Sequence, residues 1–303
     1  MARSDKGPTV GFLGLGSLGA PIARRLARGD TVVAFDPDEA RFDVVLPGVE
    51  RAASPAEVGD RADIVFACLA AEAHHRDALF GAEGLVRGER RSVYVHLGTS
   101  GSAFVAELND TLRGFGIVSI DAPVTGGPPK ARTGDLTSIV SCSPAHWLNV
   151  RDLIARYSRK TVKIDGAPGR AQTLKLVNNA IALVNLVSAC EAMVVGARAS
   201  LPPQAMLDVI NSGSGQNSAT LGKVPEHILP GTFDFGASLD VVIKDLELFL
   251  AEPAAGNGAL VDTCRSALAA YRLAKAEGVE IDDLTAVLRP MERRAGAQLR
   301  WPA

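Results

Sequence analysis

A glycine loop near the N-terminus constrains the fold of this 303-residue chain more than any other feature. Residues 10–19 read VGFLGLGSLG, so the pattern G-x-G-x-x-G stands where a short apolar run ends and a helical pattern begins. Gly14 allows a tight turn, Gly16 lets the backbone approach a pyrophosphate, and Gly19 allows close helix packing. The loop therefore predicts a β-α unit that binds a dinucleotide.

An acidic residue at the end of the second apolar run extends this predicted cofactor site. Asp36 follows Gly14 by 36 − 14 = 22 positions, close to the spacing of about 20 at which a carboxylate meets the adenine ribose. Such a carboxylate favours NAD because it repels a 2′-phosphate, although Arg41 keeps NADP open. The expected cofactor contacts in the loop are Gly14, Leu15, Gly16, Ser17, Leu18 and Gly19.

The order of apolar runs and helical patterns predicts the fold of the first half. Strands are expected at 9–13, 31–35, 63–67, 93–97, 118–121 and 137–141, and helices at 17–28, 71–80 and 102–114. Most of the strand runs are rich in Val and Ile without period-two alternation, so both faces of the sheet should be covered. We expect an α/β fold of the Rossmann type, with a doubly wound, mainly parallel sheet.

The second half of the chain reads as helical. After Gly166 a helical stretch begins near Arg170 and continues without Gly or Pro to about Val195. Further helices are expected at 204–210, 239–250, 260–277 and 281–294, with a Gly/Ser-rich loop at 212–218 and irregular loops before residue 239. We expect a dinucleotide-binding domain over residues 1–165, followed over residues 166–303 by a long interdomain helix and an all-α substrate and dimerisation domain.

Composition and charge argue against several classes of function. The 32 Lys and Arg against 34 Asp and Glu give a net charge of −2, which disfavours nucleic acid as a partner. We expect no membrane span and no signal peptide, hence a cytoplasmic protein. The four widely spaced cysteines and the scattered histidines predict free thiols and no metal site.

Four segments resemble the β-hydroxyacid dehydrogenase family, which includes 3-hydroxyisobutyrate dehydrogenase. They are GFLGLGSLGAPIARRLA at 11–27, DAPVTGGPPKARTGDLT at 121–137, KLVNN at 175–179 and KDL at 244–246. The resemblance covers nearly the whole chain. It implies hydride transfer between a nicotinamide cofactor and a small 3-hydroxy acid or semialdehyde acid.

The resemblance also implies roles for individual residues. Lys175 matches the catalytic lysine and would act as general acid and base, and Asn179, one helical turn further on, would orient it. The substrate carboxylate would bind at Thr125, Gly126 and Gly127. The remaining expected contacts are Lys244, with both substrate and cofactor, and Leu69, Thr99 and Asp245, with the cofactor.

Three departures from the family pattern bear on the substrate. Thr125 replaces the usual serine, and residues 96–99 read HLGT where the family commonly has DSST. Ala237 stands where the family often has an aromatic residue, which predicts a roomier substrate pocket unless Phe233 or Phe235 compensates. We therefore expect a substrate other than 3-hydroxyisobutyrate itself.

Two alternative functions stay open on the sequence alone. One is an imine reductase of the same domain plan, which the presence of Lys175 and Asn179 disfavours. The other is a dinucleotide-binding protein without catalysis, which the four intact motifs disfavour. The apolar surface of helices such as 174–195 favours a homodimer, with a tetramer as the alternative.

Overall fold

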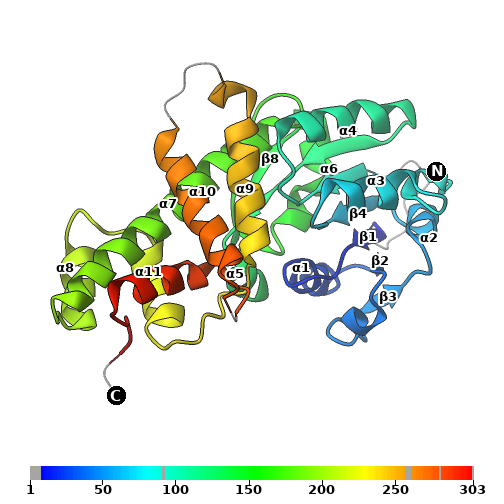
Figure 1. Ribbon diagram of the computed structural model, residues 1–303. Coiled ribbons are helices and arrows are strands. Elements are labelled where there is room, and N and C mark those ends of the chain that lie inside the picture. Colours follow the sequence, from blue (N-terminus) through cyan, green and yellow to red (C-terminus); the bar gives the residue numbers. More distant parts are fainter. Residues whose placement is uncertain (1–7, 91–92, 257–260, 280, 302–303) are drawn as a thin grey trace. The chain divides into compact units, whose positions relative to one another are not determined.

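The computed structural model describes residues 8–90, 93–256, 261–279 and 281–301. The chain divides into two compact units, residues 1–175 and 176–303. This division lies inside the long helix α7 (Arg170–Arg198) (Figure 1), whereas the boundary predicted from the sequence, after residue 165, precedes that helix.

The first unit is built on one mainly parallel sheet, as predicted. Its strands are β1 (Val10–Leu13), β2 (Val32–Phe35), β3 (Val49–Arg51), β4 (Ile64–Ala67), β5 (Val93–His96), β6 (Val118–Asp121), β7 (Val124–Thr125), β8 (Leu136–Ser141) and β9 (Ser158–Ile164). Their order is β3-β2-β1-β4-β5-β6-β8-β7, and β9 pairs with β8. Strands β1 to β6 run parallel, and β8 is antiparallel to β6 and β7.

Three of these strands were not predicted. β3 and β7 have only three and two residues, too few for a periodic pattern. β9 reads SRKTVKI, and its charged residues at 159, 160 and 163 obscure the apolar alternation. Charged residues of this kind protect an edge strand from pairing with another chain, which explains their presence in a regular strand.

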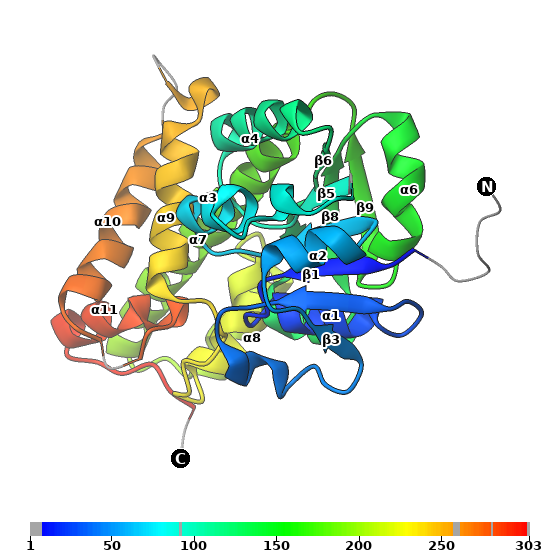
Figure 2. The ribbon, with the colours of Figure 1, turned by 90° about the vertical axis from the view of Figure 1, so that its right-hand side faces the viewer.

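Helices cover both faces of the sheet. They are α1 (Gly19–Leu26), α2 (Pro55–Arg61), α3 (Glu72–Phe80), α4 (Ser102–Gly114), α5 (Gly127–Thr133) and α6 (Pro144–Ile154), with the 3₁₀ turns η1 (Glu39–Phe42) and η2 (Leu85–Arg87). One buried cluster joins the strands to α1 and α6, and a second joins them to α2, α3 and α4 (Figure 2). The doubly wound arrangement predicted from the sequence is therefore confirmed.

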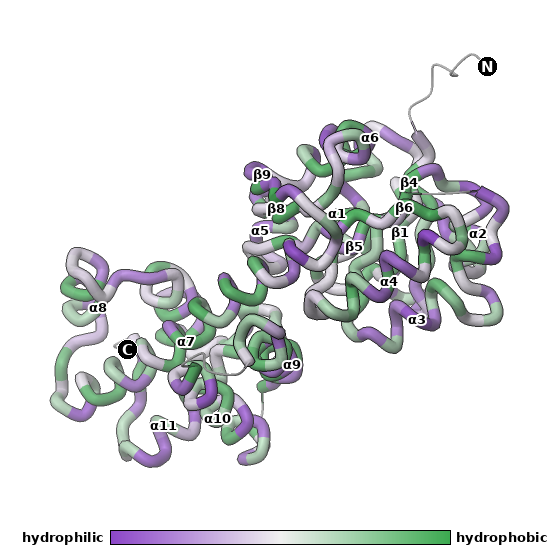
Figure 3. The backbone as a smooth tube through the Cα atoms, turned by 90° about the horizontal axis from the view of Figure 1, so that it is seen from above, coloured by the Kyte–Doolittle hydropathy of each residue, from purple (hydrophilic) through white to green (hydrophobic). Residues whose placement is uncertain are grey.

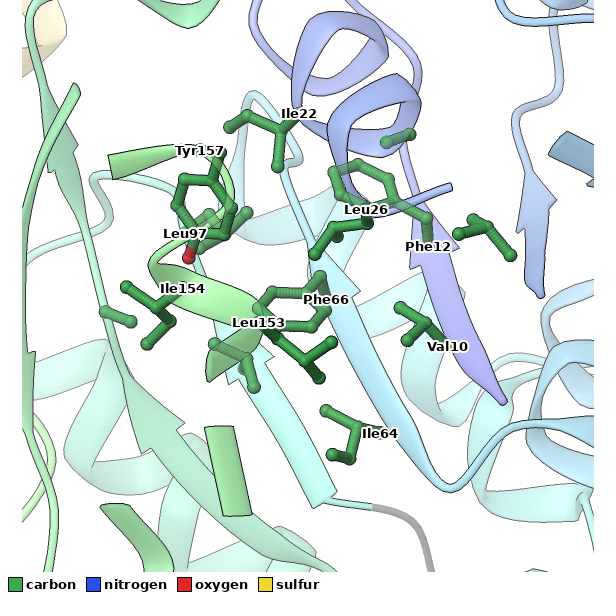
Figure 4. Close-up of a cluster of buried hydrophobic side chains, with 14 of the residues drawn as sticks. Val10, Phe12, Ile22, Leu26, Ile64, Phe66, Leu97, Leu153, Ile154 and Tyr157 are labelled. Carbon is green, nitrogen blue, oxygen red and sulfur yellow. The ribbon is translucent and has the colours of Figure 1, made fainter. Parts of the chain in front are cut away.

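The side chains of β1 and β4 contribute to both buried clusters, because successive residues of a strand point to opposite faces of the sheet. Phe12 stacks on Phe66 with ring centroids 6.4 Å apart, and Phe66 meets the edge of Tyr157 at 6.1 Å (Figure 4). The next residue of β1, Leu13, belongs to the cluster on the other face. Because successive side chains point to opposite faces, a strand buried on both sides carries an unbroken apolar run.

The second unit is all helical, as predicted. It contains the larger part of α7, then α8 (Pro203–Ser212), the π-helix η3 (Ala219–Ile228), α9 (Leu239–Ala251), α10 (Asp262–Ala276) and α11 (Leu288–Ala295), with the 3₁₀ turns η4 (Pro253–Ala255) and η5 (Leu284–Val287). Helices α9 and α10 pack side by side (Figures 1 and 2). The Tyr271 hydroxyl donates to the Leu183 carbonyl oxygen at 3.1 Å, which ties α10 to α7.

The π-helix η3 corrects the prediction of irregular loops before Leu239. It contains Pro225, whose missing N–H normally argues against a helix. The wider π geometry instead shows in the bond from the Leu229 amide to the Val224 carbonyl oxygen, five residues back, at 2.9 Å. Local sequence rules therefore failed here because they assume α-helical spacing.

Helix α7 bears on the expectation that the chain contains no membrane span. By length and composition alone it is able to cross a membrane, and 44% of its most apolar window is buried inside the protein. Green dominates much of its tube in Figure 3. Leu186, Cys190 and Met193 are fully buried in the core of the second unit, so this face of α7 packs against protein.

Candidate active site

The glycine loop joins the end of β1 to the start of α1. Gly14 has a φ of +90°, and a Cβ on it would lie 2.5 Å from the Cys68 carbonyl oxygen. A Cβ on Gly19 would overlap the Gly14 carbonyl oxygen. Glycine is therefore required at both positions, at the first by backbone conformation and at both by close approach.

The N-terminus of α1 faces this loop and suits an anion. Among the described residues, no side chain caps α1, and its first turn contains no acidic residue. The Ala20 amide already donates to the Gly16 carbonyl oxygen at 3.0 Å, and Pro21 has no N–H. The partial positive charge of the helix end therefore favours a phosphate group. Gly16 has no side chain, and a Cβ there would lie 3.1 Å from Arg41 Nη1. These features fit the pyrophosphate of a dinucleotide.

Asp36 follows β2 directly and closes the glycine loop. The side chain is nearly buried, and its Oδ2 accepts a hydrogen bond from the Leu15 amide at 2.6 Å. Its Oδ1 accepts from the Asp38 amide at 3.0 Å, and Arg41 Nε lies 3.7 Å from the same oxygen. Each carboxylate oxygen has two lone pairs, so Asp36 retains acceptor capacity for a ribose hydroxyl.

The parallel register brings further predicted residues to the same edge of the sheet. Leu13 pairs with Phe35 on one side and with Ala67 on the other, and Ala67 pairs with His96. Leu69 and Thr99 follow the last two of these strands, so they lie at the carboxyl edge, where open α/β sheets bind ligands. A Cβ on Gly14 would lie 2.8 Å from the Leu69 side chain.

The segment that departs from the family pattern after β5 packs on two buried histidines. The rings of His96 and His75 stack with centroids 4.3 Å apart. His75 Nδ1 and the Tyr94 hydroxyl lie 2.8 Å apart. A Cβ on Gly98 would lie 3.4–3.5 Å from the Nε2 atoms of both rings. His96 and His75 therefore pack beneath Gly98, in the loop that leads to Thr99.

The predicted substrate segment leaves the sheet at β7. Thr125 pairs with Thr137 of β8. Gly126 and Gly127 have φ values of +129° and +72°, a region that favours glycine. The two glycines turn the chain from β7 into α5. Because they have no side chains, no Cβ atom follows Thr125 at these two positions.

Lys175 lies on α7, five residues after the helix begins. The residue is only 8% exposed, so it is not a solvated surface lysine. Asn179 lies one helical turn further along and is half-buried, while Asn178 points away and is exposed. The KLVNN segment therefore presents Lys175 and Asn179 on one side of α7.

Within the second unit, Asn179 belongs to a small polar network. Its Nδ2 donates to Asp245 Oδ2 at 2.7 Å, and Lys244 Nζ lies 2.9 Å from Asp245 Oδ1. Asp245 is nearly buried on α9. The structure thus brings together three residues from two of the predicted motifs. Asp245 accepts a hydrogen bond from Asn179 at Oδ2 and forms an ion pair with Lys244 at Oδ1.

The sequence left open whether Phe233 or Phe235 compensates for the missing ring at Ala237. Phe233 is 1% exposed and has the Arg289 and Arg300 guanidinium groups 4.9 Å from its ring centroid. It is therefore a core residue of the second unit. Phe235 is half-buried, with Lys223 Nζ 5.0 Å from its ring centroid.

Sequence reasoning missed a buried network at the start of α7. Asp121, at the end of β6, is fully buried and accepts from the Gly169 amide at 2.9 Å, the Gln172 amide at 3.2 Å and Gln172 Nε2 at 2.7 Å. Burial raises the pKa of the Asp121 carboxyl to about 6, although these hydrogen bonds act in the opposite direction. An aspartate that ends an apolar strand was the available signal for Asp121, whereas no pattern pointed to Gln172.

The described residues contain no group of three or more His, Cys, Asp or Glu side chains able to hold a metal ion. All four cysteines are free, with Cys142 and Cys190 buried and Cys68 and Cys264 half-buried. The candidate site therefore consists of hydrogen-bonding side chains, backbone amides and one nearly buried lysine. A dinucleotide-binding α/β unit with such a lysine is typical of nicotinamide-dependent oxidoreductases.

Comparison with known proteins identifies the family within this class. Residues 9–166 match the NAD binding domain of 6-phosphogluconate dehydrogenase, and residues 169–291 match the NAD-binding domain of NADP-dependent 3-hydroxyisobutyrate dehydrogenase. The chain belongs to the 3-hydroxyisobutyrate dehydrogenase-like, β-hydroxyacid dehydrogenase family of NAD(P)-dependent oxidoreductases, which act on CH–OH groups.

Individual relatives are similar over most of their length. The chain is 31% identical to L-threonate dehydrogenase of Cupriavidus necator, over 80% of this chain and 82% of the relative. It is 29% identical to 2-(hydroxymethyl)glutarate dehydrogenase of Eubacterium barkeri, over 97% and 98%. The crystal structure of 3-hydroxyisobutyrate dehydrogenase from Salmonella typhimurium superposes with a TM-score of 0.84 at 27% identity, over 94% and 100%.

Proposed function

We propose that the protein transfers a hydride between a nicotinamide cofactor and a small 3-hydroxy acid, with Lys175 as the general acid and base. The bound cofactor would accept or donate the hydride. In the oxidation, the Lys175 amine accepts the proton of the substrate hydroxyl while the C–H bond breaks and the C=O bond forms. In the reduction, the lysine ammonium returns a proton to the carbonyl oxygen.

The observation that carries this proposal is the burial of Lys175 in the KLVNN segment. Lysine is rarely buried unless it is paired or functional, and here it is 8% exposed on a helix that also carries Asn179. The family relationship supports a proton-transfer role for a lysine in this motif. Asn179, itself held by Asp245, would orient the reacting groups.

The carboxylate of the substrate would bind at Thr125, Gly126 and Gly127. The two glycines keep the backbone free of Cβ atoms at positive φ, and the Thr125 hydroxyl adds a donor. The first turn of α5 contains Pro128 and Pro129, which have no N–H to offer. Recognition there would therefore depend on the residues just before the helix.

The proposal is tested by replacing Lys175 with alanine. We expect kcat to fall by about 10²- to 10⁴-fold because proton transfer is lost, while the Kd for the cofactor stays within about threefold. Lys160→Ala, which changes an exposed lysine of β9, is the matched control and should keep the activity of the natural chain. An equal loss of turnover and cofactor affinity in Lys175→Ala would instead identify the residue as structural.

A substrate panel tests the class of substrate. It would contain 2-(hydroxymethyl)glutarate, L-threonate, 3-hydroxyisobutyrate and cyclic imines, each followed through the absorbance of the reduced nicotinamide. We expect the highest kcat/KM on a hydroxy acid other than 3-hydroxyisobutyrate, because Ala237 lacks the ring common at this position. Preferential reduction of a C=N bond would overturn this proposal in favour of an imine reductase.

We further propose NAD as the preferred cofactor. The support is Asp36, whose nearly buried carboxylate stands at the end of β2 and would repel a 2′-phosphate. Arg41 is half exposed beside it, so its attraction for a phosphate is screened by solvent. We expect a higher kcat/KM with NAD than with NADP on the same substrate, and the reverse order would contradict the assignment.

A further inference from the structure

The first turn of α7 depends on a carboxylate from a distant part of the chain. A helix begins with backbone amides that have no partner inside the helix. Here the Gly169 and Gln172 amides donate to Oδ2 of Asp121, which lies 48 and 51 residues earlier in the chain. Asp121 is fully buried at the end of β6. The position of this turn is therefore set by the sheet.

Gln172 uses its side-chain amide to connect three parts of the first unit. Its Nε2 donates to Asp121 Oδ1 at 2.7 Å and to the Gly98 carbonyl oxygen at 3.1 Å. Its Oε1 accepts from the Ser100 amide at 2.9 Å. Gln172 is fully buried and Ser100 nearly so, and breaking such bonds leaves buried polar groups unsatisfied.

The bonds of Gln172 lie close to two residues of the proposed reaction, Thr99 and Lys175. Gly98 and Ser100 flank Thr99, so one amide fixes the backbone on both sides of it. Lys175 follows Gln172 by three residues on α7, which places the two side chains on neighbouring positions of one helix face. Gly98 also rests against the stacked rings of His75 and His96.

We propose that Gln172 and Asp121 are positioning residues that act on the reaction through Lys175. They fix the first turn of α7 against the ends of β5 and β6, and so hold the lysine amine at the depth and angle that proton transfer requires. Misplacing a reacting group by about 1 Å can cost about 10²-fold in rate. This inference rests on the proposed role of Lys175.

A double-mutant cycle tests the coupling. Gln172→Ala, Lys175→Ala and the double variant are assayed at a temperature well below the unfolding midpoint of each. We expect Gln172→Ala to lower kcat about 10- to 100-fold, with the Kd for the cofactor within about threefold. On the Lys175→Ala background the same change should lower the residual kcat by less than about twofold, because its effect requires the lysine.

Two further variants make the test specific. Gln172→Met keeps the length of the side chain without its hydrogen bonds, and replaces the alanine variant in the cycle if that variant does not fold. Gln204→Ala removes an exposed glutamine whose Nε2 donates to Asp208 at 2.7 Å on α8, and should leave kcat unchanged. The Gln204→Ala variant shows what the loss of a glutamine from a helix does to kcat when that glutamine lies away from the proposed site.

Two results would overturn the inference while the proposed function stands. One is a loss of kcat by the same factor in both backgrounds, and the other is a lower melting temperature for the Gln172 variants with unchanged kcat. A Lys175→Ala variant with full activity would refute the proposed function itself and this inference with it. The single lysine variant therefore distinguishes the two failures.

Discussion

At the scale of single residues, Asp121 shows how burial and hydrogen bonding compete. Its carboxylate is fully buried, yet it accepts from Gly169 and Gln172. The hydrogen bonds stabilise the charged form, and the loss of water destabilises it. The pKa of the carboxyl is raised to about 6 in the folded chain. Burial therefore has a larger effect on this pKa than the hydrogen bonds have.

This raised pKa predicts a pH-dependent contribution to stability. Between its ordinary pKa of about 3.9 and about 6, the folded chain binds a proton at Asp121 that the unfolded chain does not. The stabilising contribution is therefore complete below about pH 4 and is lost as the pH rises through about 6.

Asp121→Asn isolates this contribution from other titrating groups. The free energy of unfolding of the natural chain minus that of the variant should decrease by about 3 kcal/mol between pH 4 and pH 7. Urea denaturation at intervals of one pH unit measures it. A difference that stays constant, or that grows with pH, would contradict the role of burial.

At the scale of elements, the β1-α1 unit is the part of the fold that local sequence specifies most completely. β1 is buried on both faces, and α1 begins at Gly19. A side chain on Gly19 would meet the Gly14 carbonyl oxygen, which is backbone and cannot turn away. The helix would have to move from the strand, and the turn between them would open.

Gly19→Ala therefore tests the close approach. We expect the free energy of unfolding to fall by about 2 kcal/mol, typical of overpacking a tight site, and the cofactor to bind at least tenfold more weakly. Urea denaturation and a fluorescence titration with the reduced cofactor measure these effects.

The matched control for this substitution is Gly114→Ala, at the end of α4. A Cβ there meets no atom within 4 Å, so the change should leave cofactor affinity unaltered and stability within about 1 kcal/mol of the natural chain. Equal behaviour of the two variants would show that Gly19 is not sterically required.

At the scale of the whole molecule, α7 leaves apolar side chains uncovered. Leu174, Val177 and Ile181 recur at helical spacing and are 38%, 40% and 59% exposed, and Val195 further along is 68% exposed. Covering such a stripe with a second copy would remove apolar surface from water. We propose that the protein forms a homodimer through this stripe of α7.

Ile181→Glu tests the assembly. A charge at this position should convert the dimer to a monomer, because an unpaired carboxylate is costly to bury, and light scattering coupled to size exclusion measures the mass. Val209→Glu, on α8 at 72% exposure, is the control and should keep the dimer mass. An Ile181→Glu variant that stays dimeric would place the interface elsewhere, and a mass of four chains would indicate the tetramer.

The sequence by itself determined the features that depend on near neighbours. Unbroken Val- and Ile-rich runs specify strands buried on both faces, and the glycine spacing in 14–19 specifies the turn into α1. The doubly wound, mainly parallel sheet was predicted from the alternation of these runs with helical patterns, and the all-helical second unit from the helical patterns after residue 170. Four motifs in order were sufficient to indicate the family.

Only the tertiary structure decided the features that depend on distant neighbours. The short strands β3 and β7 form because a strand beside them supplies hydrogen bonds, and η3 is a π-helix although it contains Pro225. His96 stacks on a histidine 21 positions earlier, and Gln172 bonds to Asp121 at a separation of 51. A sequence pattern records local periodicity, whereas these contacts exist only after burial has brought remote segments together and required their polar atoms to find partners.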